Sequence, residues 1–334
     1  MDKKAIALIS GGLDSLLAAK VVMEEGIEVF GVTFIMPFAS RDINRFEKRV
    51  KEASSDAAIP IKVIDISGDF LNVLKAPKHG YGANINPCID CKILMLRIAK
   101  KIMEKEKAGF IVTGEVLGER PMSQRKRALN IIRKRSGLEG LLLRPLSAKL
   151  LEKTIPEKEG IINRAKLLDI QGRSRYKQMK LAEKYGIRKF FSPAGGCLLT
   201  DQIFSKKLKE LMDKNDLDLE NVSLLKYGRH FRLDEGTKVV VGRNEKDNGE
   251  ILNLKKDNDV ILRLKDEPGP YALLRGNAKR ENIEKASSFV VGLSKKKRAK
   301  ETEVEFWSDK TDINILIANT IADGEMQKLK CESL

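Results

Sequence analysis

The chain has 334 residues, 42% of them hydrophobic, which is enough for two domains with cores of their own. Its 63 Lys and Arg outnumber the 47 Asp and Glu, and the formal net charge of +16 favours a polyanionic partner, nucleic acid above all. No apolar stretch reaches the length of a membrane span or a signal sequence, so we expect a cytoplasmic protein with no membrane partner. Four cysteines without a secretory signal favour metal or redox chemistry over a disulfide framework.

From residue 1 to about residue 191, short β-branched runs alternate with longer helical segments, a pattern typical of a doubly wound, mostly parallel α/β sheet. We expect strands at residues 5–9, 28–34, 61–66 and 110–113, and helices at residues 14–25, 41–57 and 89–107. The carboxyl ends of such strands gather at one edge, where open α/β sheets bind ligands.

A glycine turn joins the first expected strand to the first expected helix, and it reads Ser10-Gly11-Gly12-Leu13-Asp14-Ser15. Adjacent glycines let the backbone approach a ligand closely, and the amides at the start of a helix attract an anion, so the turn predicts a phosphate site. Its spacing fits neither the kinase-type P-loop nor the dinucleotide fingerprint. A tight turn in which Asp14 and Ser15 only cap the helix is the structural alternative.

The turn resembles the SGGxDS signature of the PP-loop ATP pyrophosphatase superfamily, whose domain is of the adenine nucleotide alpha hydrolase type. The resemblance implies that residues 10–15 bind the phosphates of ATP and that Asp14 is catalytic and acts through Mg²⁺. Phe34 would pack against adenine, and Thr113 and Gly114 at the end of another expected strand would complete the nucleotide site.

Three cysteines fall within the first expected domain, namely Cys88 and Cys91 at the start of a helix and Cys197 far along the chain. Zinc would require a fourth protein ligand, and neither His79 nor His230 has suitable spacing. Cys331 lies in a polar tail that we expect to be too mobile to serve as a ligand. Three thiolates can instead hold a [4Fe-4S] cluster with one iron left open.

This arrangement resembles the tRNA-thiolating branch of the PP-loop superfamily. The resemblance implies a [4Fe-4S] cluster that is held by Cys88, Cys91 and Cys197 and carries sulfide beside the nucleotide. In a related branch, two equivalent thiols carry and resolve a persulfide without a metal, and Cys91 and Cys197 would form that catalytic pair. A structural zinc half-site or merely buried thiols are the remaining alternatives.

Residues 1–202 are thus expected to form the catalytic domain, residues 203–226 a helical connector and residues 227–334 a smaller α+β domain. In the last domain we expect a helix at residues 282–293 and strands at residues 231–233, 237–242, 251–254, 260–264, 271–275 and 303–307. The motifs Val241-Gly242-Arg243-Asn244 and, at residues 268–275, PGPYALLR resemble the RNA-binding domain at the end of NFACT-type proteins.

Basic residues in both domains are candidates for contact with an RNA backbone. In the first domain they are Arg125, Lys126, Arg127, Arg144, Arg173 and Arg175, and in the second Lys295, Lys296, Lys297 and Arg298. Arg144 and Arg173 are also candidates for stabilising the charge that builds up on phosphoryl oxygens. A solvated charge or an ion pair explains these two arginines equally well.

Together the motifs predict an ATP-dependent tRNA thiouridylase, which adenylates a uridine carbonyl oxygen and replaces it with sulfur. Its expected partners are tRNA, a sulfur donor in the form of sulfide or a persulfide-carrying protein, and possible second copies of the chain in a homodimer. One alternative is a PP-loop enzyme that forms an amide or nitrile on a small molecule and binds zinc through its cysteines. The other alternative is a non-catalytic RNA-binding factor with a regulatory nucleotide site.

Overall fold

The computed structural model describes residues 2–38, 40, 42–191, 197–295, 301–309 and 312–331. The chain folds into two units, Met1–Thr200 and Asp201–Leu334. Among the described residues, no helix combines the length and the apolar character needed to cross a membrane.

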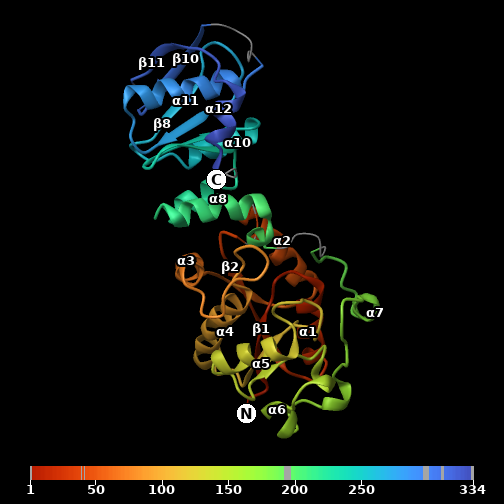
Figure 1. Cartoon of the computed structure of the whole chain (residues 1–334). Helices are drawn as coiled ribbons and strands as arrows, with labels where there is room; N and C mark the ends of the chain where they lie inside the picture. Colours follow the sequence, from red (N-terminus) through yellow and green to blue (C-terminus); the bar gives the residue numbers. More distant parts are fainter. Residues whose placement is uncertain are drawn as a thin grey trace. The chain divides into compact units, whose positions relative to one another are not determined.

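Unit 1 contains a five-stranded, fully parallel sheet with the strand order β3-β2-β1-β4-β5 (Figure 1). Its strands are β1 (Lys4–Leu8), β2 (Glu28–Ile35), β3 (Ile61–Asp65), β4 (Phe110–Thr113) and β5 (Leu142–Leu143). Its α-helices are α1 (Leu13–Met23), α2 (Ile43–Asp56), α3 (Ser67–Lys75), α4 (Cys88–Lys105), α5 (Lys126–Arg135), α6 (Ile155–Lys158) and α7 (Tyr176–Lys184), and short 3-10 turns span Ala148–Leu150, Arg164–Lys166 and Leu198–Thr200. The expected doubly wound α/β architecture is confirmed.

Helices cover both faces of this sheet. Helix α1 packs on β1, β2 and β4 and against α7, while α4 packs on β1 and β4 and against α3 and α5. The apolar sequence of α1 follows from this position, because eight of its residues are buried between the sheet and its neighbours. Leu8 at the end of β1 pairs with Val32 of β2 and Thr113 of β4. The carboxyl ends of the three central strands therefore meet at one edge.

Unit 2 contains a six-stranded antiparallel sheet with the strand order β11-β10-β8-β9-β7-β6. Its strands are β6 (Arg229–Asp234), β7 (Thr237–Val241), β8 (Val260–Leu264), β9 (Ala272–Arg275), β10 (Thr302–Trp307) and β11 (Asn314–Ala318). Its helices are α8 (Gln202–Asp213), α9 (Leu219–Leu224), α10 (Glu245–Asn253), α11 (Arg280–Gly292) and α12 (Asp323–Lys328). Helix α11 covers one face, where the rings of Phe231 and Phe289 lie 4.3 Å apart.

The prediction of a strand at residues 251–254 is wrong, because these residues end α10 or follow it directly. The side chain of Asn244 caps this helix by accepting a hydrogen bond from the amide of Asp247 at 2.9 Å. Ile251 is fully buried in a cluster with Trp307. The cap and a single apolar face therefore outweigh the alternation that indicated a strand.

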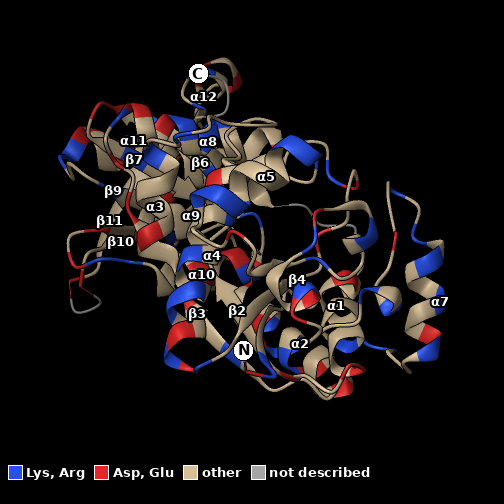
Figure 2. Ribbon diagram, turned by 90° about the horizontal axis from the view of Figure 1, so that it is seen from below, with Lys and Arg blue, Asp and Glu red and all other residues tan. Residues whose placement is uncertain are grey.

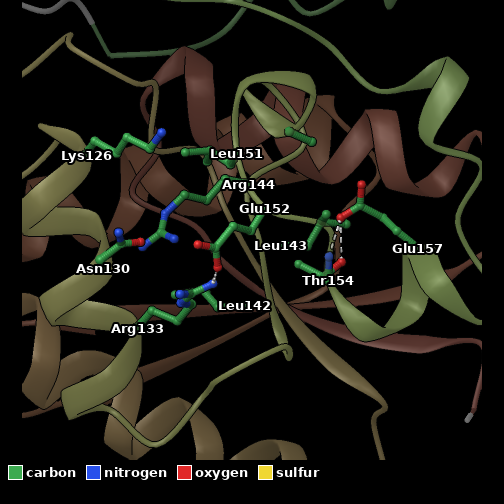
Figure 3. Close-up of a pocket in the computed structure, with 11 residues that line it drawn as sticks. Lys126, Asn130, Arg133, Leu142, Leu143, Arg144, Leu151, Glu152, Thr154 and Glu157 are labelled. Atoms are coloured by element: carbon green, nitrogen blue, oxygen red, sulfur yellow. Dashed lines mark hydrogen bonds and ion pairs between the residues drawn. The ribbon is translucent and has the colours of Figure 1, made fainter.

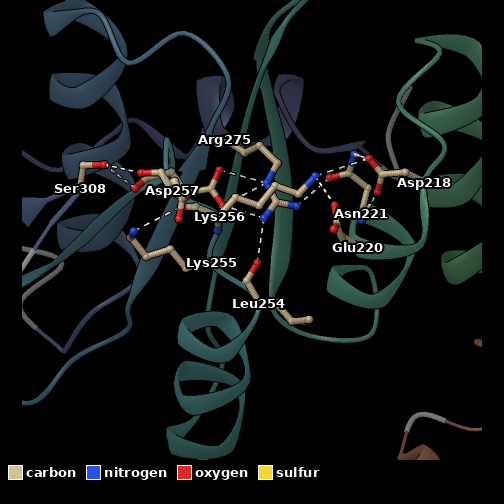
Figure 4. Close-up of polar contacts among 10 residues, drawn as sticks. Asp218, Glu220, Asn221, Leu254, Lys255, Lys256, Asp257, Arg275 and Ser308 are labelled. Atoms are coloured by element: carbon tan, nitrogen blue, oxygen red, sulfur yellow. Dashed lines mark hydrogen bonds and ion pairs between the residues drawn. The ribbon is translucent and has the colours of Figure 1, made fainter.

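The helices of the expected connector at residues 203–226 lie in unit 2 and contact its sheet. Glu210 of α8 forms a buried ion pair with Arg232 of β6, with 2.6 Å between carboxylate and guanidinium. Arg275 of β9 donates to the side chain of Asn221 in α9 at 2.8 Å (Figure 4). Arg275 also pairs with Asp259 at 2.6 Å. These contacts make the two helices part of the unit 2 fold.

Candidate functional site

The glycine turn of unit 1 lies at the carboxyl edge of the sheet, between β1 and α1. Gly11 has a φ of +76°, which favours glycine, and Gly12 is the N-cap of α1 without a side chain that could cap the helix. The hydroxyl of Ser15 donates to the carbonyl oxygen of Gly12 at 2.7 Å and accepts from the amide of Ser10 at 3.2 Å. Ser15 thus stabilises the turn and does not cap the helix amides, so the positive end of α1 has no side-chain cap from the described residues and could bind an anion.

Gly114 brings the end of β4 against this turn. A Cβ atom at position 114 would lie 2.4–2.5 Å from backbone atoms of Asp14 and Ser15, so only glycine allows the approach. The hydroxyl of Thr113 donates to Glu115 at 3.1 Å, and Phe34 at the end of β2 is only 8% exposed. The structure therefore brings Thr113 and Gly114 together with residues 10–15, and it places most of the Phe34 ring in the interior.

A distant segment covers the turn. The amide of Phe191 donates to the carbonyl oxygen of Gly11 at 2.8 Å, and the Phe191 ring would lie 3.0 Å from a Cβ atom at that glycine. The guanidinium of Arg49 lies over the same ring, 4.5 Å from its centroid. No local signal in the sequence indicates this contact, because it joins positions 180 residues apart.

Polar side chains from two further segments lie around Asp14. Burial raises the pKa of Asp14 above its usual value, while nearby Arg175 and Gln178 oppose that rise. Burial and the carboxylate of Asp14 also raise the pKa of Glu119. Sequence analysis missed Glu119 and Gln178, since neither belongs to a motif and their approach depends on tertiary structure.

The three cysteines of unit 1 lie at the same edge of the sheet as the glycine turn. Cys88 and Cys91 occupy the first turn of α4. This helix packs on β1 and β4 and ends shortly before β4 begins, so its first turn lies toward the carboxyl edge of the sheet. Cys197 precedes Leu198, whose amide donates to the carbonyl oxygen of Phe38 beyond β2 at 3.1 Å. The topology thus brings the thiols and the glycine turn to one edge.

The thiols of these cysteines are close enough to influence one another. Burial raises the pKa of Cys91, and the thiols of Cys88 and Cys197 raise it further. Burial also raises the pKa of Cys197 to about 11. Across the described residues, no group of three or more His, Cys, Asp or Glu side chains is arranged to hold a single metal ion. A [4Fe-4S] cluster differs from a single ion because each thiolate binds its own iron, so three neighbouring thiols match the number of ligands of a cluster with one open iron.

His79 and Cys331, which the sequence analysis did not choose as metal ligands, have structural roles. The Nδ1 atom of His79 lies 2.8 Å from one carboxylate oxygen of Asp90. The other oxygen of Asp90 accepts a hydrogen bond from the backbone amide of His79 at 2.8 Å. This pair fixes the loop before α4. Cys331 is fully buried in unit 2, so the expectation that it lies in a mobile tail is wrong.

Arg144 is buried beside a small cavity of about 30 Å³ that is also lined by Lys126, Asn130 and Arg133 (Figure 3). Its Nε atom donates to Glu115 at 2.9 Å, and Nη2 donates to the carbonyl oxygen of Leu129 at 3.3 Å. Of the alternatives open from the sequence, the structure thus shows the ion pair.

The remaining predicted basic residues lie at several places on the surface. Arg125, Lys126 and Arg127 are exposed at the N-terminal end of α5, Arg173 is exposed before α7, and Arg175 is the half-buried N-cap of α7. Lys and Arg are prominent along both α5 and α7 (Figure 2). Lys295 follows α11 and is exposed, whereas Lys296, Lys297 and Arg298 lie outside the described residues.

Two family models match the chain. The model described as "Thiamine biosynthesis protein (ThiI)" matches residues 1–182, and the model described as "NFACT protein RNA binding domain" matches residues 228–329.

Curated relatives include the probable tRNA sulfurtransferase of Ureaplasma parvum serovar 3, which is 30% identical over 172 residues, covering 50% of this chain and 40% of the relative. The probable tRNA sulfurtransferase of Methanosarcina mazei is 32% identical over 126 residues, covering 35% of this chain and 29% of the relative. The chain thus spans well under half the length of both relatives. A solved 4-thiouridine synthetase in complex with RNA and bound ATP matches with 21% identity and a TM-score of 0.31, covering 55% of this chain and 51% of that chain.

Proposed function

Because this chain belongs to the ThiI family, we propose that it is an ATP-dependent tRNA thiouridylase. The observation that carries this proposal is the single sheet edge at which the glycine turn and three thiols of unit 1 gather. An enzyme that activates a carbonyl oxygen and then delivers sulfur to the same carbon needs both groups beside one substrate.

In the first step, the uridine carbonyl oxygen attacks the α-phosphorus of ATP, and pyrophosphate leaves. The amides at the start of α1 and its dipole bind the phosphates, and Asp14 acts through Mg²⁺. Sulfide then attacks the activated carbon, and AMP leaves with the former carbonyl oxygen. In the persulfide alternative, the outer sulfur of a persulfide on one thiol of the pair Cys91 and Cys197 attacks the carbon and AMP leaves. The other thiol of the pair then attacks the carrier sulfur, which releases the thiouridine and leaves a disulfide that an external thiol reduces before the next cycle. The chain's own residues orient the base and stabilise charge on the phosphoryl oxygens.

Cys88, Cys91 and Cys197 would hold the [4Fe-4S] cluster, which supplies sulfide at its open iron when it is bound. This assignment is supported by the closeness of the three thiols, since those of Cys88 and Cys197 raise the pKa of Cys91. The sulfur source is then free sulfide or a persulfide-carrying protein.

The proposed tRNA partner is supported by the RNA-binding family match in unit 2 and by the basic residues at the start of α5. Arg125, Lys126 and Arg127 lie at the positive end of that helix, where cations are disfavoured by the dipole. Three exposed cations in such a position suit a polyanion better than they suit helix stability. We propose that they and Lys295 contact the tRNA backbone.

The decisive experiment incubates anaerobically purified protein with tRNA transcripts, ATP and sulfide. Thiouridine is then measured by mass spectrometry and pyrophosphate release in parallel. Asp14→Ala should abolish pyrophosphate release and leave RNA binding largely intact. Pyrophosphate release that depends on a small molecule, with no RNA affinity, would favour the amide- or nitrile-forming alternative. Tight RNA binding without any pyrophosphate release would favour a binding factor.

Cysteine variants test the sulfur chemistry. Cys88→Ala, Cys91→Ala and Cys197→Ala should each lower the iron and sulfide content and stop thiolation, whereas the matched variant Cys331→Ala in unit 2 should retain both. If iron is absent and only Cys91 and Cys197 are required, the persulfide pair is the correct interpretation. Light scattering tests the homodimer expected from the sequence.

A further inference from the structure

Residues from two further segments of unit 1 lie around the carboxyl group of Asp14. Helix α7 packs against α1, and this packing brings Arg175 and Gln178 to the start of α1. The turn after β4 brings Glu119, because Gly114 lies against the Asp14 backbone and the amide of Gly172 donates to Leu117 at 2.8 Å. The proposed phosphate turn therefore has a polar wall that its motif does not contain.

Gln178 is the unusual member of this wall. Its side chain is completely buried and close enough to Asp14 for a side-chain hydrogen bond to lower the pKa of that carboxyl, yet among the described residues neither its amide oxygen nor its amide nitrogen makes a hydrogen bond of good geometry. The Oδ1 atom of Asp14 and the Nε atom of Arg175 are also buried, and neither has a hydrogen-bond partner among the residues that the structure describes. Buried polar groups in native proteins are nearly always satisfied, so these atoms are available to hydrogen-bond a ligand or an ordered water at the site.

Glu119 is held in place by its own turn. The amide of Gly118 donates to the carbonyl oxygen of Gln124 at 2.8 Å, and the amide of Arg120 donates to the Gln124 side chain at 3.1 Å. Gln124 is only 4% exposed, so the turn is anchored in the interior. Its tip thus presents the carboxyl group of Glu119 to that of Asp14.

Two carboxylates at such close range repel each other unless a cation or proton lies between them. Mg²⁺ is bound in proteins by one or two carboxylates together with phosphate oxygens of the substrate. The positive charges of Arg120 and Arg175 balance the negative charges of Asp14 and Glu119. When ATP binds, its phosphates add negative charge, and a further cation is needed to neutralise it.

We propose that Glu119 is the second carboxylate of a divalent-cation site shared with Asp14, and that Gln178 is a positioning residue that orients the Asp14 carboxylate in the loaded site. This inference rests on the proposed binding of ATP to the glycine turn. It adds two residues that the SGGxDS motif lacks and assigns the cation to the wall between α1, α7 and the turn after β4.

The test uses Mn²⁺ as a paramagnetic probe and the full chain. Free Mn²⁺ is titrated by electron paramagnetic resonance in the presence of saturating ATP, and ATP binding is measured separately in EDTA. Glu119→Gln keeps the size of the side chain and removes its charge. We expect this variant to weaken Mn²⁺ binding to the ATP complex about tenfold or more and to bind ATP normally in EDTA. Glu183→Gln removes the same charge from an exposed position of α7 and should leave both values unchanged.

Gln178→Met distinguishes positioning from a structural role. The substitution removes two buried polar atoms that lack hydrogen bonds of good geometry to the described residues, at similar volume, so the ligand-free protein should melt at a higher temperature than the wild type. Its Mn²⁺ affinity in the ATP complex should nevertheless fall about tenfold. If Gln178 only stabilised the fold, the melting temperature and the Mn²⁺ affinity would change in the same direction.

The results distinguish failure of the cation site from failure of the proposed function. Wild-type ATP binding with equal Mn²⁺ affinity in the wild type and Glu119→Gln overturns the inference and leaves the proposed function standing. A wild-type chain that binds no ATP overturns both. Loss of Mn²⁺ affinity in Glu119→Gln together with a raised melting temperature and reduced affinity in Gln178→Met supports the inference.

Discussion

Replacing Arg144 by alanine should strongly destabilise unit 1. The pair of Arg144 and Glu115 spans 2.9 Å, and its side chains are only 5% and 2% exposed. Burial opposes the charged form of Glu115, but Arg144 and then Lys92 outweigh it and lower the pKa of the carboxyl. Arg144→Ala would leave this buried carboxylate unpaired, which costs about 3–5 kcal/mol. For a unit of this size, the loss corresponds to a fall in melting temperature of roughly 6–20 °C.

Urea unfolding followed by hydrogen exchange and mass spectrometry measures the effect unit by unit. Peptides from β4 and β5 report unit 1, whereas fluorescence of Trp307, the single tryptophan, reports unit 2 and should keep its transition. The loss of stability in Arg144→Ala should become smaller as the pH falls. The pKa of Glu115 is lowered in the folded protein, so ionised Glu115 stabilises unit 1 above the usual pKa of a glutamate, and this stabilisation is lost when Glu115 is protonated.

Two variants control for charge alone. Arg133→Ala removes a partly exposed arginine whose partner Glu152 is 67% exposed, and it should change stability little. Glu115→Met combined with Arg144→Met removes both charges and should recover most of the lost stability. If Arg144→Ala is as stable as Arg133→Ala and instead loses RNA affinity, the ion-pair reasoning is refuted and Arg144 is an RNA contact.

Three further predictions concern other contacts. Gly114→Ala should lower both the melting temperature of unit 1 and its affinity for ATP, because the new Cβ atom would overlap the start of α1. Thermal melting measures the first effect and titration with fluorescent ATP the second. An unchanged ATP affinity would contradict the prediction. His230 is buried, its Nε2 atom lies 2.8 Å from the carbonyl oxygen of Tyr227, and burial lowers its pKa, so unit 2 should lose up to about 1.4 kcal/mol per pH unit below pH 6.5. Trp307 melting curves between pH 5 and 8 should show this slope in the wild type and lack it in His230→Gln. Arg49→Ala should cost about 0.5–1 kcal/mol and speed amide exchange at the turn under Phe191; equal exchange rates would exclude this role.

Local signals predicted much of unit 1. The apolar run of β1, the two glycines and the apolar α1 specify a strand, a turn and a helix, because each depends on neighbours within a few residues. The same holds for Cys88 and Cys91, which a helix start brings together. Once the strands are parallel, chain connectivity alone brings these segments to one edge of the sheet.

The sequence by itself thus determined the doubly wound fold, the glycine turn and the location of the paired cysteines. Only the tertiary structure decided that Phe191 covers Gly11, that Arg144 pairs with Glu115, and that Glu119 and Gln178 face Asp14. The reason is the range of the forces. Turn and helix preferences act between neighbours, whereas burial and charge pairing depend on which distant segments the packed sheet and helices bring into contact.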